Sequence, residues 1–324
     1  MNVKIEEARA CYKFTMHLLR ICPTVLLLGL AATPALGQTR WKVEPPGTGR
    51  ITGSFADGRV GETSGVAPSR RVGGVIWTHN DAGDGPLIYA SDTTGTALGT
   101  FRVSGARNRD WEDIAFGPCG YRYTCLYLAD TGDNRENEKT VALYRLPEPS
   151  LPVKHPRRIE DTRPAESLRI RYPDGPHDVE AMWVAQNGDA HLVTKGRSGP
   201  IKHYRVPASA WGSEKTVTAE LIERLPIPLS STEDYVTGAG LSPDGRTVAI
   251  RTYSRIYFFF PSRDGTLETP SDPLACDVHR LGPQGEAVGW LDQSRIVLTS
   301  ERGLFSAGTI AVVDCPLPVR VAQR

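Results

Sequence analysis

Short runs of β-branched and aromatic residues recur along the chain, and most end at a glycine, proline or aspartate. Runs of this kind are typical of β-strands. Helix-period stretches are scarce, and only residues 7–13 and 208–215 look faintly helical. The 32 glycines and 25 prolines are spread along the chain and suit frequent tight turns. The pattern therefore predicts an all-β fold built from short strands.

A weak internal repeat of about 50 to 70 residues organises these runs, and repeats of such a length are the mark of propellers and solenoids. Each repeat opens on a segment of small residues and continues with a turn and a second β-rich run. A polar loop and a third run follow. The opening segments are residues 62–67, 110–115, 178–183, 235–240 and 284–289.

The later runs can be assigned repeat by repeat. The second strands are expected at 74–78, 125–129, 190–194, 247–251 and 295–299. The third strands are expected at 87–91, 141–145, 201–205, 256–260 and 309–313. Fourth strands are found in four repeats, at 97–101, 167–171, 218–222 and 277–280.

The last repeat has no fourth strand of its own, and the stretch from Arg50 to Phe55 can supply it. Phe55 would then lie on a strand beside the one that contains Val313, and the ring would close without an open sheet edge. The sequence predicts a single β-propeller of five blades, each with four antiparallel strands. A degenerate sixth blade within 148–164 and a β-sandwich remain as alternatives, although a sandwich needs no repeat of this length.

The N-terminus has the features of an export signal. An apolar core at 24–32 follows Arg20, and small residues precede a cleavage site before Gln38. We expect a signal peptide at 1–37, a linker at 38–49 and the propeller at 50–324, with Met16 as an alternative start. The mature protein would be secreted or periplasmic. A retained membrane anchor is the alternative, but the apolar core is short for a span.

The cysteines agree with export. Removal of the signal leaves four, an even number, and an oxidising compartment favours disulfides. Cys119 and Cys125 flank a short hairpin connection and are expected to pair, which leaves Cys276 with Cys315. A zinc site is the rival interpretation, but the chain has no CxxC motif beside these residues.

Charge and motifs exclude several functions. The formal net charge is +1 and no basic block is present, so we expect no nucleic-acid partner and no membrane contact after signal removal. The motifs of serine hydrolases, P-loop proteins, zinc proteases and dinucleotide-binding enzymes are absent. The oligomeric state is left open.

The repeat brings equivalent residues together, because the first strand of each propeller blade lines the central channel. Three glutamates in one ring repel one another unless a cation lies among them. Oxygen ligands of this kind favour Ca²⁺ before Mg²⁺. The alternative is a water-filled channel with protonated or arginine-paired carboxylates. The predicted metal ligands are Ser64, Glu112, Glu180, Thr237 and Glu286, with Glu62, Asp110 and Asp178 as outer or water-mediated partners.

The loops that follow the second strands reach the same mouth. An Asp-x-Gly-Asp motif occurs in two of them, starting at Asp81 and Asp130. With His79, these two residues are the candidate catalytic groups; ordinary turn chemistry is the alternative. Lys195, Arg251 and Arg302 occupy equivalent places in the other blades and are candidate anion-binding residues, unless they form salt bridges between blades. Acidic groups beside cations suit a metal-bridged anion such as a phosphate ester.

Four motifs carry a resemblance to known proteins: Glu62-Thr-Ser-Gly-Val, the Asn80-Asp81 turn, Asp110-Trp-Glu-Asp-Ile-Ala and Leu128-Ala-Asp-Thr-Gly-Asp-Asn. Over roughly residues 61–149 the chain resembles a group of uncharacterised secreted bacterial β-propeller proteins. The opening motif is also similar to that of the calcium-activated nucleotidases (apyrases), five-bladed propellers with a central calcium that hydrolyse nucleoside diphosphates. That resemblance implies that the five predicted ligands fall on calcium-site positions.

The chain departs from the nucleotidases in its loops, which lack their nucleotide-stacking pattern, so the substrate does not carry over. A looser likeness is to phytase-like and esterase-like propellers. Two functions follow. The first is metal-dependent hydrolysis of phosphate esters. The second is a non-catalytic ligand-binding or scaffolding role with a structural calcium, because the sequence shows no clear general base.

Overall fold

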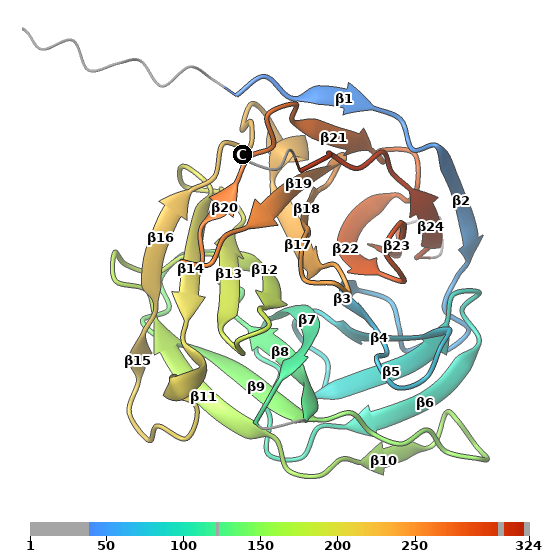
Figure 1. Ribbon diagram of the computed structural model, residues 1–324. Helices are drawn as coiled ribbons and strands as arrows, with labels where there is room; N and C mark the ends of the chain where they lie inside the picture. The colour runs from blue at the N-terminus through green and yellow to red at the C-terminus, as the bar shows by residue number, and fades with distance from the viewer. Residues whose placement is uncertain (1–38, 121–122, 304–307, 321–324) are drawn as a thin grey trace, which may run out of the picture. The chain divides into compact units, whose positions relative to one another are not determined.

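The computed structural model describes residues 39–120, 123–303 and 308–320. The predicted signal peptide and the stretch 7–13 lie outside the described residues. Residues from Gln38 onward form one compact unit. Within it, five sheets stand around a central channel (Figure 1). The predicted five-bladed β-propeller is confirmed.

Each blade contains four antiparallel strands, counted outward from the channel. The innermost strands are β3 (Thr63–Pro68), β7 (Trp111–Pro118), β12 (Val179–Val184), β17 (Val236–Leu241) and β22 (Gln284–Trp290). The second strands are β4 (Val75–Asn80), β8 (Thr124–Asp130), β13 (Ala190–Thr194), β18 (Val248–Thr252) and β23 (Arg295–Glu301). The third strands are β5 (Leu87–Asp92), β9 (Val141–Pro147), β14 (Lys202–Val206), β19 (Arg255–Pro261) and β24 (Ile310–Asp314). The fourth strands are β6 (Ala97–Arg102), β11 (Glu166–Arg171), β16 (Glu220–Arg224), β21 (Leu274–Asp277) and β2 (Thr48–Gly53).

The N-terminal strand closes the ring as predicted. β2 pairs with β24 in the antiparallel sense, with Gly49 opposite Val313. The placement of Phe55 on this strand is wrong, because β2 ends at Gly53. A Cβ at Gly53 would lie 2.0 Å from the carbonyl oxygen of Thr94, so the strand ends where it meets the β5–β6 turn. Phe55 packs instead against the buried cluster between the last and first blades.

Short additional strands border several blades. β1 (Lys42–Glu44) pairs with β21, β10 (Ile159–Asp161) with β6, and β15 (Val217–Thr218) with β11, all in parallel. β20 (Leu267–Glu268) pairs with β19 in the antiparallel sense. The stretch 148–164, where a sixth blade was considered, thus supplies an outer strand of the first blade. The expected linker at 38–49 holds β1 and the start of β2.

Two predicted fourth strands were misplaced. The strand predicted at 277–280 is β21, which ends at Asp277, where the carboxylate accepts the N–H of His279 and turns the chain. The stretch predicted at 218–222 spans the boundary between β15 and β16. The faint helix expected at 208–215 is one short 3₁₀ turn, η1 (Ala208–Ala210); a second such turn, η2 (Thr232–Asp234), precedes β17.

The core is divided among the spaces between neighbouring blades. Five buried clusters occur, and each takes its side chains from two adjacent blades. Trp77, Trp111, Trp183 and Trp290 are almost completely buried within them. Because this packing holds the innermost strands at fixed separations, residues on those strands can meet in the channel.

Both predicted disulfides are present. Cys119–Cys125 spans the β7–β8 turn, and Cys276–Cys315 joins β21 to the segment that follows β24. Disulfides of this kind are typical of proteins in oxidising compartments. Within the described part of the chain, no helix is long and apolar enough to cross a membrane.

Candidate metal centre in the central channel

A register shift interrupts the pairing of every innermost strand with the second strand of its blade. Such a bulge leaves one residue out of the ladder and re-aims its side chain. The skipped residues are Ser64, Glu112, Glu180, Thr237 and Glu286. All five are buried. The residues predicted from the repeat as metal ligands therefore occupy equivalent bulge positions, one in each blade.

Carboxylates converge at two overlapping positions. One oxygen from each of Glu112, Asp178 and Glu180 lies within 4.8 Å of the others, and all three residues are buried. A second group joins Glu112 to Asp81 and Asp110, which are partly exposed. Glu112 belongs to both groups. Asp110 and Asp178 were expected only as outer partners, but each has a carboxylate oxygen within 4.8 Å of one of Glu112.

Two hydroxyls belong to the same ring. Ser64 Oγ donates a hydrogen bond of 3.0 Å to Glu112 Oε2. Thr237 Oγ1 is fully buried and has no hydrogen-bond partner among the described residues. A buried polar atom without a partner costs about 1–3 kcal/mol. A hydroxyl oxygen in this state, at the bulge position equivalent to those of Glu112 and Glu180, fits a site for a hard cation such as Ca²⁺.

The electrostatics of the channel favour protonation in the absence of a cation. Burial raises the pKa of Glu112 well above its ordinary value, and the neighbouring Glu180 and Asp81 carboxylates raise it further. Burial and Asp81 raise the pKa of Asp110 to about 8. Burial also raises the pKa of Glu286 well above the usual range, and Glu180 adds to the effect. Like charges in a confined space thus resist simultaneous ionisation.

Two cations partly compensate these charges. Lys195 Nζ lies 2.5 Å from Glu180 Oε1, and Arg197 Nε lies 3.0 Å from Asp178 Oδ2. Burial lowers the pKa of Lys195, but the Glu180 carboxylate more than offsets this, so the net shift is upward. Burial likewise raises the pKa of Glu180, which stays above its ordinary value despite Lys195.

The three predicted anion-binding residues lie in different surroundings. Lys195 is paired with Glu180. Arg251 is buried, and its Nη1 donates to the carbonyl oxygens of Ala287 at 2.6 Å and Thr299 at 2.9 Å. Burial lowers the pKa of Arg251 to about 10. Of the three, Arg302 alone is exposed.

The mouth contains two further groups that the sequence analysis did not assign. Burial raises the pKa of Glu301 to about 7, with further contributions from Asp81 and Glu62. Burial and then Glu286 raise the pKa of Tyr253. Both lie at or just after the end of a second strand. The signal was present in the sequence, since Lys195 and Asp81 follow the second strands of other blades.

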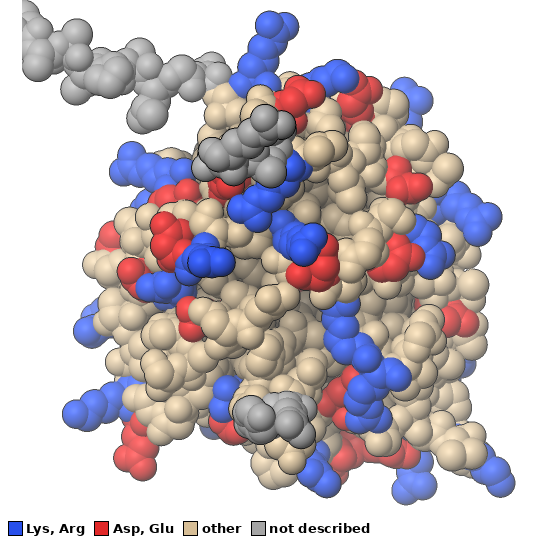
Figure 2. Space-filling model, in the orientation of Figure 1, with Lys and Arg blue, Asp and Glu red and all other residues tan. Residues whose placement is uncertain are grey.

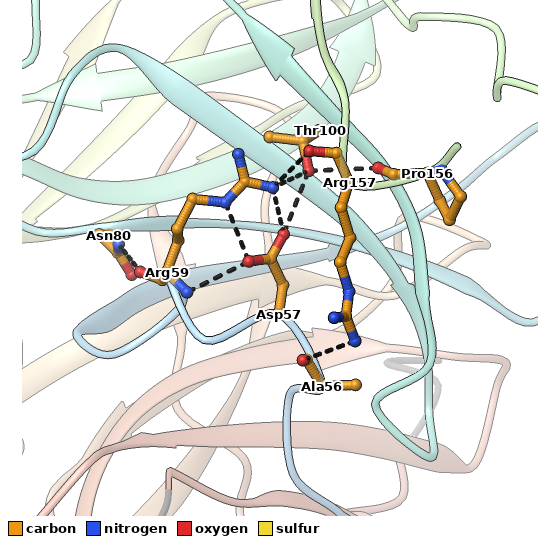
Figure 3. Close-up of polar contacts among 7 residues, drawn as sticks. All are labelled: Ala56, Asp57, Arg59, Asn80, Thr100, Pro156 and Arg157. Carbon is orange, nitrogen blue, oxygen red and sulfur yellow. Dashed lines mark hydrogen bonds and ion pairs between the residues drawn. The ribbon is translucent and has the colours of Figure 1, made fainter. Parts of the chain in front are cut away.

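Asn80 holds the backbone that leads into β3. Its Oδ1 accepts the N–H groups of Gly61 at 3.1 Å and Glu62 at 3.2 Å. Its Nδ2 donates to the carbonyl of Arg59, whose guanidinium pairs with Asp57 (Figure 3). Asn80 therefore fixes the start of the strand that carries Ser64.

Asp130 does the same in the second blade. Its Oδ1 accepts the N–H groups of Arg109 at 3.1 Å and Asp110 at 2.9 Å. Asn80 and Asp130 are thus equivalent, whereas the repeated Asp-x-Gly-Asp motif had matched Asp81 with Asp130. The structure separates that pair, because Asp81 lies with the carboxylates of Asp110 and Glu112, whereas Asp130 accepts hydrogen bonds from the backbone.

His79 is fully enclosed. Its Nδ1 lies 3.0 Å from the carbonyl oxygen of Asn80, and its ring stands edge-on to Trp111. Burial lowers its pKa to about 4, so the ring is neutral at pH 7. Of the three predicted catalytic residues, Asp81 is the one that is both partly exposed and among the carboxylates.

Asp113 links the innermost strands of three blades through hydrogen bonds. Its carboxylate accepts the N–H groups of Ile114 at 2.8 Å, Met182 at 2.7 Å and Ala239 at 3.1 Å. These groups belong to the innermost strands of three blades. Burial raises the pKa of Asp113 well above its ordinary value. The sequence analysis did not single it out, because two of its three partners, Met182 and Ala239, are backbone groups far away in the chain.

No known protein-family model matches the chain, and no curated protein matches its sequence. Solved structures do match. The PQQ-bound aldose sugar dehydrogenase of Streptomyces coelicolor is 13% identical, with 84% of this chain and 99% of that chain covered and a TM-score of 0.46. The calcium-binding protein regucalcin of Agrobacterium tumefaciens is 12% identical, with 86% and 98% covered and a TM-score of 0.43. A gluconolactonase of Xanthomonas campestris is 13% identical, with 84% and 99% covered and a TM-score of 0.40.

Similarities at this level carry no argument about activity, so the propeller assignment rests on the sheets described above. The likeness to nucleotidases and phytase-like propellers stays a prediction.

Proposed function

We propose that this protein is a cation-binding propeller whose channel holds a hard divalent cation, Ca²⁺ before Mg²⁺. The convergence of Glu112, Asp178 and Glu180 carries the proposal, because their buried oxygens lie within 4.8 Å of one another. Thr237, with its unpartnered buried hydroxyl, supports it. Ser64 and Glu286 lie at equivalent bulge positions and would complete the ring.

The test measures calcium binding and thermal stability in two variants, Glu180→Gln and Lys195→Met. The first removes a negative charge from the site and the second removes a positive charge. Glu180→Gln removes one ligand charge and keeps the shape, so the affinity for Ca²⁺ should fall about tenfold or more. Because a ligand that binds only the folded state stabilises it, calcium should raise the melting temperature of the wild type and raise that of the variant less. Glu214→Gln, at an exposed site away from the channel, is the matched control.

Lys195→Met tests the same site from the other side. Lys195 occupies the oxygen of Glu180 that a cation would need. In chelator the variant should be less stable than the wild type, since Glu180 loses its partner. Added calcium should restore the stability of Lys195→Met and should bind to it more tightly than to the wild type.

Two results together would contradict the proposal: a wild-type melting temperature that does not change with calcium or chelator, and a Glu180→Gln variant that is more stable than the wild type with or without calcium. The channel would then be an acidic channel without a cation.

Hydrolysis of phosphate esters is the second candidate function. It is favoured by the group of Asp81, Asp110 and Glu112, which is partly exposed and could hold a cation within reach of a ligand. A bound cation would supply charge stabilisation to phosphate oxygens. Asp81 and Asp110 would hold it, and the exposed Arg302 is the predicted anion-binding residue with its side chain accessible.

Phosphate release from p-nitrophenyl phosphate and nucleoside diphosphates, with Ca²⁺ or Mg²⁺ and with chelator, tests this candidate. Asp81→Asn should abolish release while retaining the calcium-induced rise in melting temperature, because the buried group remains. If the wild type releases no phosphate under any of these conditions, the non-catalytic binding role replaces the hydrolase.

We also propose that the protein is exported. The two disulfides support this proposal, together with the apolar core at 24–32. N-terminal sequencing of the mature protein should begin at Gln38, and an intact N-terminus on protein recovered from the cytoplasm would argue against export.

A further inference from the structure

The end of the channel opposite the carboxylates contains a second hollow. Its volume is about 430 Å³, which lies in the range of small-molecule sites. The far ends of the innermost strands form its wall, and most of the wall is apolar. The larger apolar side chains that line it include Val66, Ile114, Phe116, Trp183, Val288 and Trp290.

The hollow has a positive charge at its edge, whereas the other end of the channel contains the carboxylates. Among the residues that the structure describes, the lining of the hollow contains no aspartate or glutamate, and Arg70 is the one charged residue. Figure 2 shows one face of the molecule, on which Lys, Arg, Asp and Glu lie mostly towards the border and a tan area lies near the middle.

Arg70 has no carboxylate within ion-pair distance in the described part of the chain. Its guanidinium makes one long contact, 3.5 Å from Nη2 to the carbonyl oxygen of Leu241. The neighbouring Arg71 differs, because its Nη1 donates to the carbonyl of Glu148 at 3.0 Å and Nε lies 4.0 Å from the Glu148 carboxylate. Arg70 thus presents an exposed, uncommitted fork of donors at the edge of an apolar hollow.

We propose that this hollow binds a small organic carboxylate with a compact apolar body. A guanidinium matches a carboxylate through two parallel hydrogen bonds, and the apolar body would be removed from water by the aromatic and aliphatic wall. None of the described lining residues is acidic, so none of them repels the ligand.

Binding of 2-naphthoate, followed by quenching of tryptophan fluorescence and by calorimetry, tests the proposal. The neutral analogue 2-naphthamide has nearly the same shape and no charge. The wild type should bind 2-naphthoate saturably and at least about tenfold more tightly than the amide, the difference expected for a hydrogen bond to a charged group. Arg70→Gln should remove that preference and leave amide binding unchanged.

Arg135→Gln, at an exposed position in the β8–β9 loop, is the control and should bind like wild type. Calcium, chelator and Glu180→Gln should leave naphthoate binding unchanged, because the two mouths are separate. Equal affinity for acid and amide, an Arg70→Gln variant that binds like wild type, or no saturable binding at millimolar naphthoate would each overturn the proposal.

Discussion

At the scale of single residues, Gly132 lets the backbone come close to the channel carboxylates. A Cβ on this residue would lie 2.1 Å from Glu112 Oε1 and 2.5 Å from the carboxyl carbon of Asp110. Its φ lies outside the left-handed region, so the requirement is for space. The missing side chain lets the loop after β8 fold over both carboxylates.

Gly132→Ala should therefore displace Glu112 and Asp110. We expect calcium affinity to fall about tenfold and the free energy of unfolding to fall by about 1–3 kcal/mol, as in other overpacked sites. Calcium titration and urea unfolding measure the two effects. Gly58→Ala is the control, because a Cβ there would meet nothing within 4 Å. Equal behaviour of the two variants would show that the loop is not packed against the carboxylates.

The channel residues could be predicted from the sequence because the repeat places them at the same step of each opening segment. The repeat placed them on the first strand of each blade, and the structure adds a local cause. Each residue, such as Glu180 between Val179 and Ala181, is skipped by the ladder at a bulge. Spacing identified the residues without revealing the bulge, since nothing in a short strand of small residues marks where pairing slips.

At the scale of elements, Asn80 and Asp130 act as clamps, because each accepts the backbone N–H groups that precede an innermost strand. Their equivalence could not be predicted correctly from the sequence. The motif in the loops aligns Asp81 with Asp130. Cross-strand pairing aligns Asn80 with Asp130, since Asn80 is opposite Thr63 and Asp130 is opposite Trp111, each the last residue before a bulge. Register depends on contacts between strands, so the loop sequence alone misses it by one residue.

Asp130 offers a prediction about these clamps. Asp130→Asn keeps an oxygen that can accept both N–H groups, as Asn80 does in the first blade, so its stability should stay within about 1 kcal/mol of wild type. Asp130→Ala leaves both donors without a partner and should cost about 2–3 kcal/mol. Urea unfolding measures both, with the exposed Asp161→Ala as control. A loss in Asp130→Asn as large as in Asp130→Ala would contradict the clamp.

At the scale of the whole molecule, ring closure could be predicted because a missing fourth strand and an unassigned N-terminal stretch implied each other. The outer strands β1, β10 and β15 could not be predicted, because a strand of two or three residues is too short to show a periodic pattern. Their pairing is parallel to strands of other repeats, so it depends on the assembled ring. The sequence therefore predicts the blades better than it predicts their borders.

The stability of the folded protein should also depend on pH. The raised pKa values of the channel carboxylates decide whether stability rises or falls with pH. Burial and like charges raise the pKa of Glu301 to about 7 and that of Asp110 to about 8. The folded, cation-free protein then binds more protons than the unfolded chain between pH 4 and these values. Because stability falls with rising pH wherever the folded state holds the extra protons, it should decline as pH passes through about 7 to 8.

Buried histidines act in the opposite direction but at lower pH. Burial lowers the pKa of His79 to about 4 and that of His191 to about 3. Their contribution to stability is complete above the unfolded value of about 6.5 and is lost as pH falls below it. The interval from about pH 6.5 to 8.5 therefore isolates the carboxylates from the histidines.

In chelator, the melting temperature should fall across that interval, because the channel must ionise without compensation. In saturating calcium the fall should vanish, since ionised carboxylates are the ligands and protons compete with the cation. The calcium-induced rise in melting temperature should therefore grow with pH. Glu301→Gln should flatten the chelator curve while retaining most of the calcium response, because Glu301 lies in neither carboxylate group. A melting temperature in chelator that stays constant or rises between pH 6.5 and 8.5 would contradict this. The carboxylates would then already be ionised, with their charges compensated by other groups of the protein, and no cation would be needed.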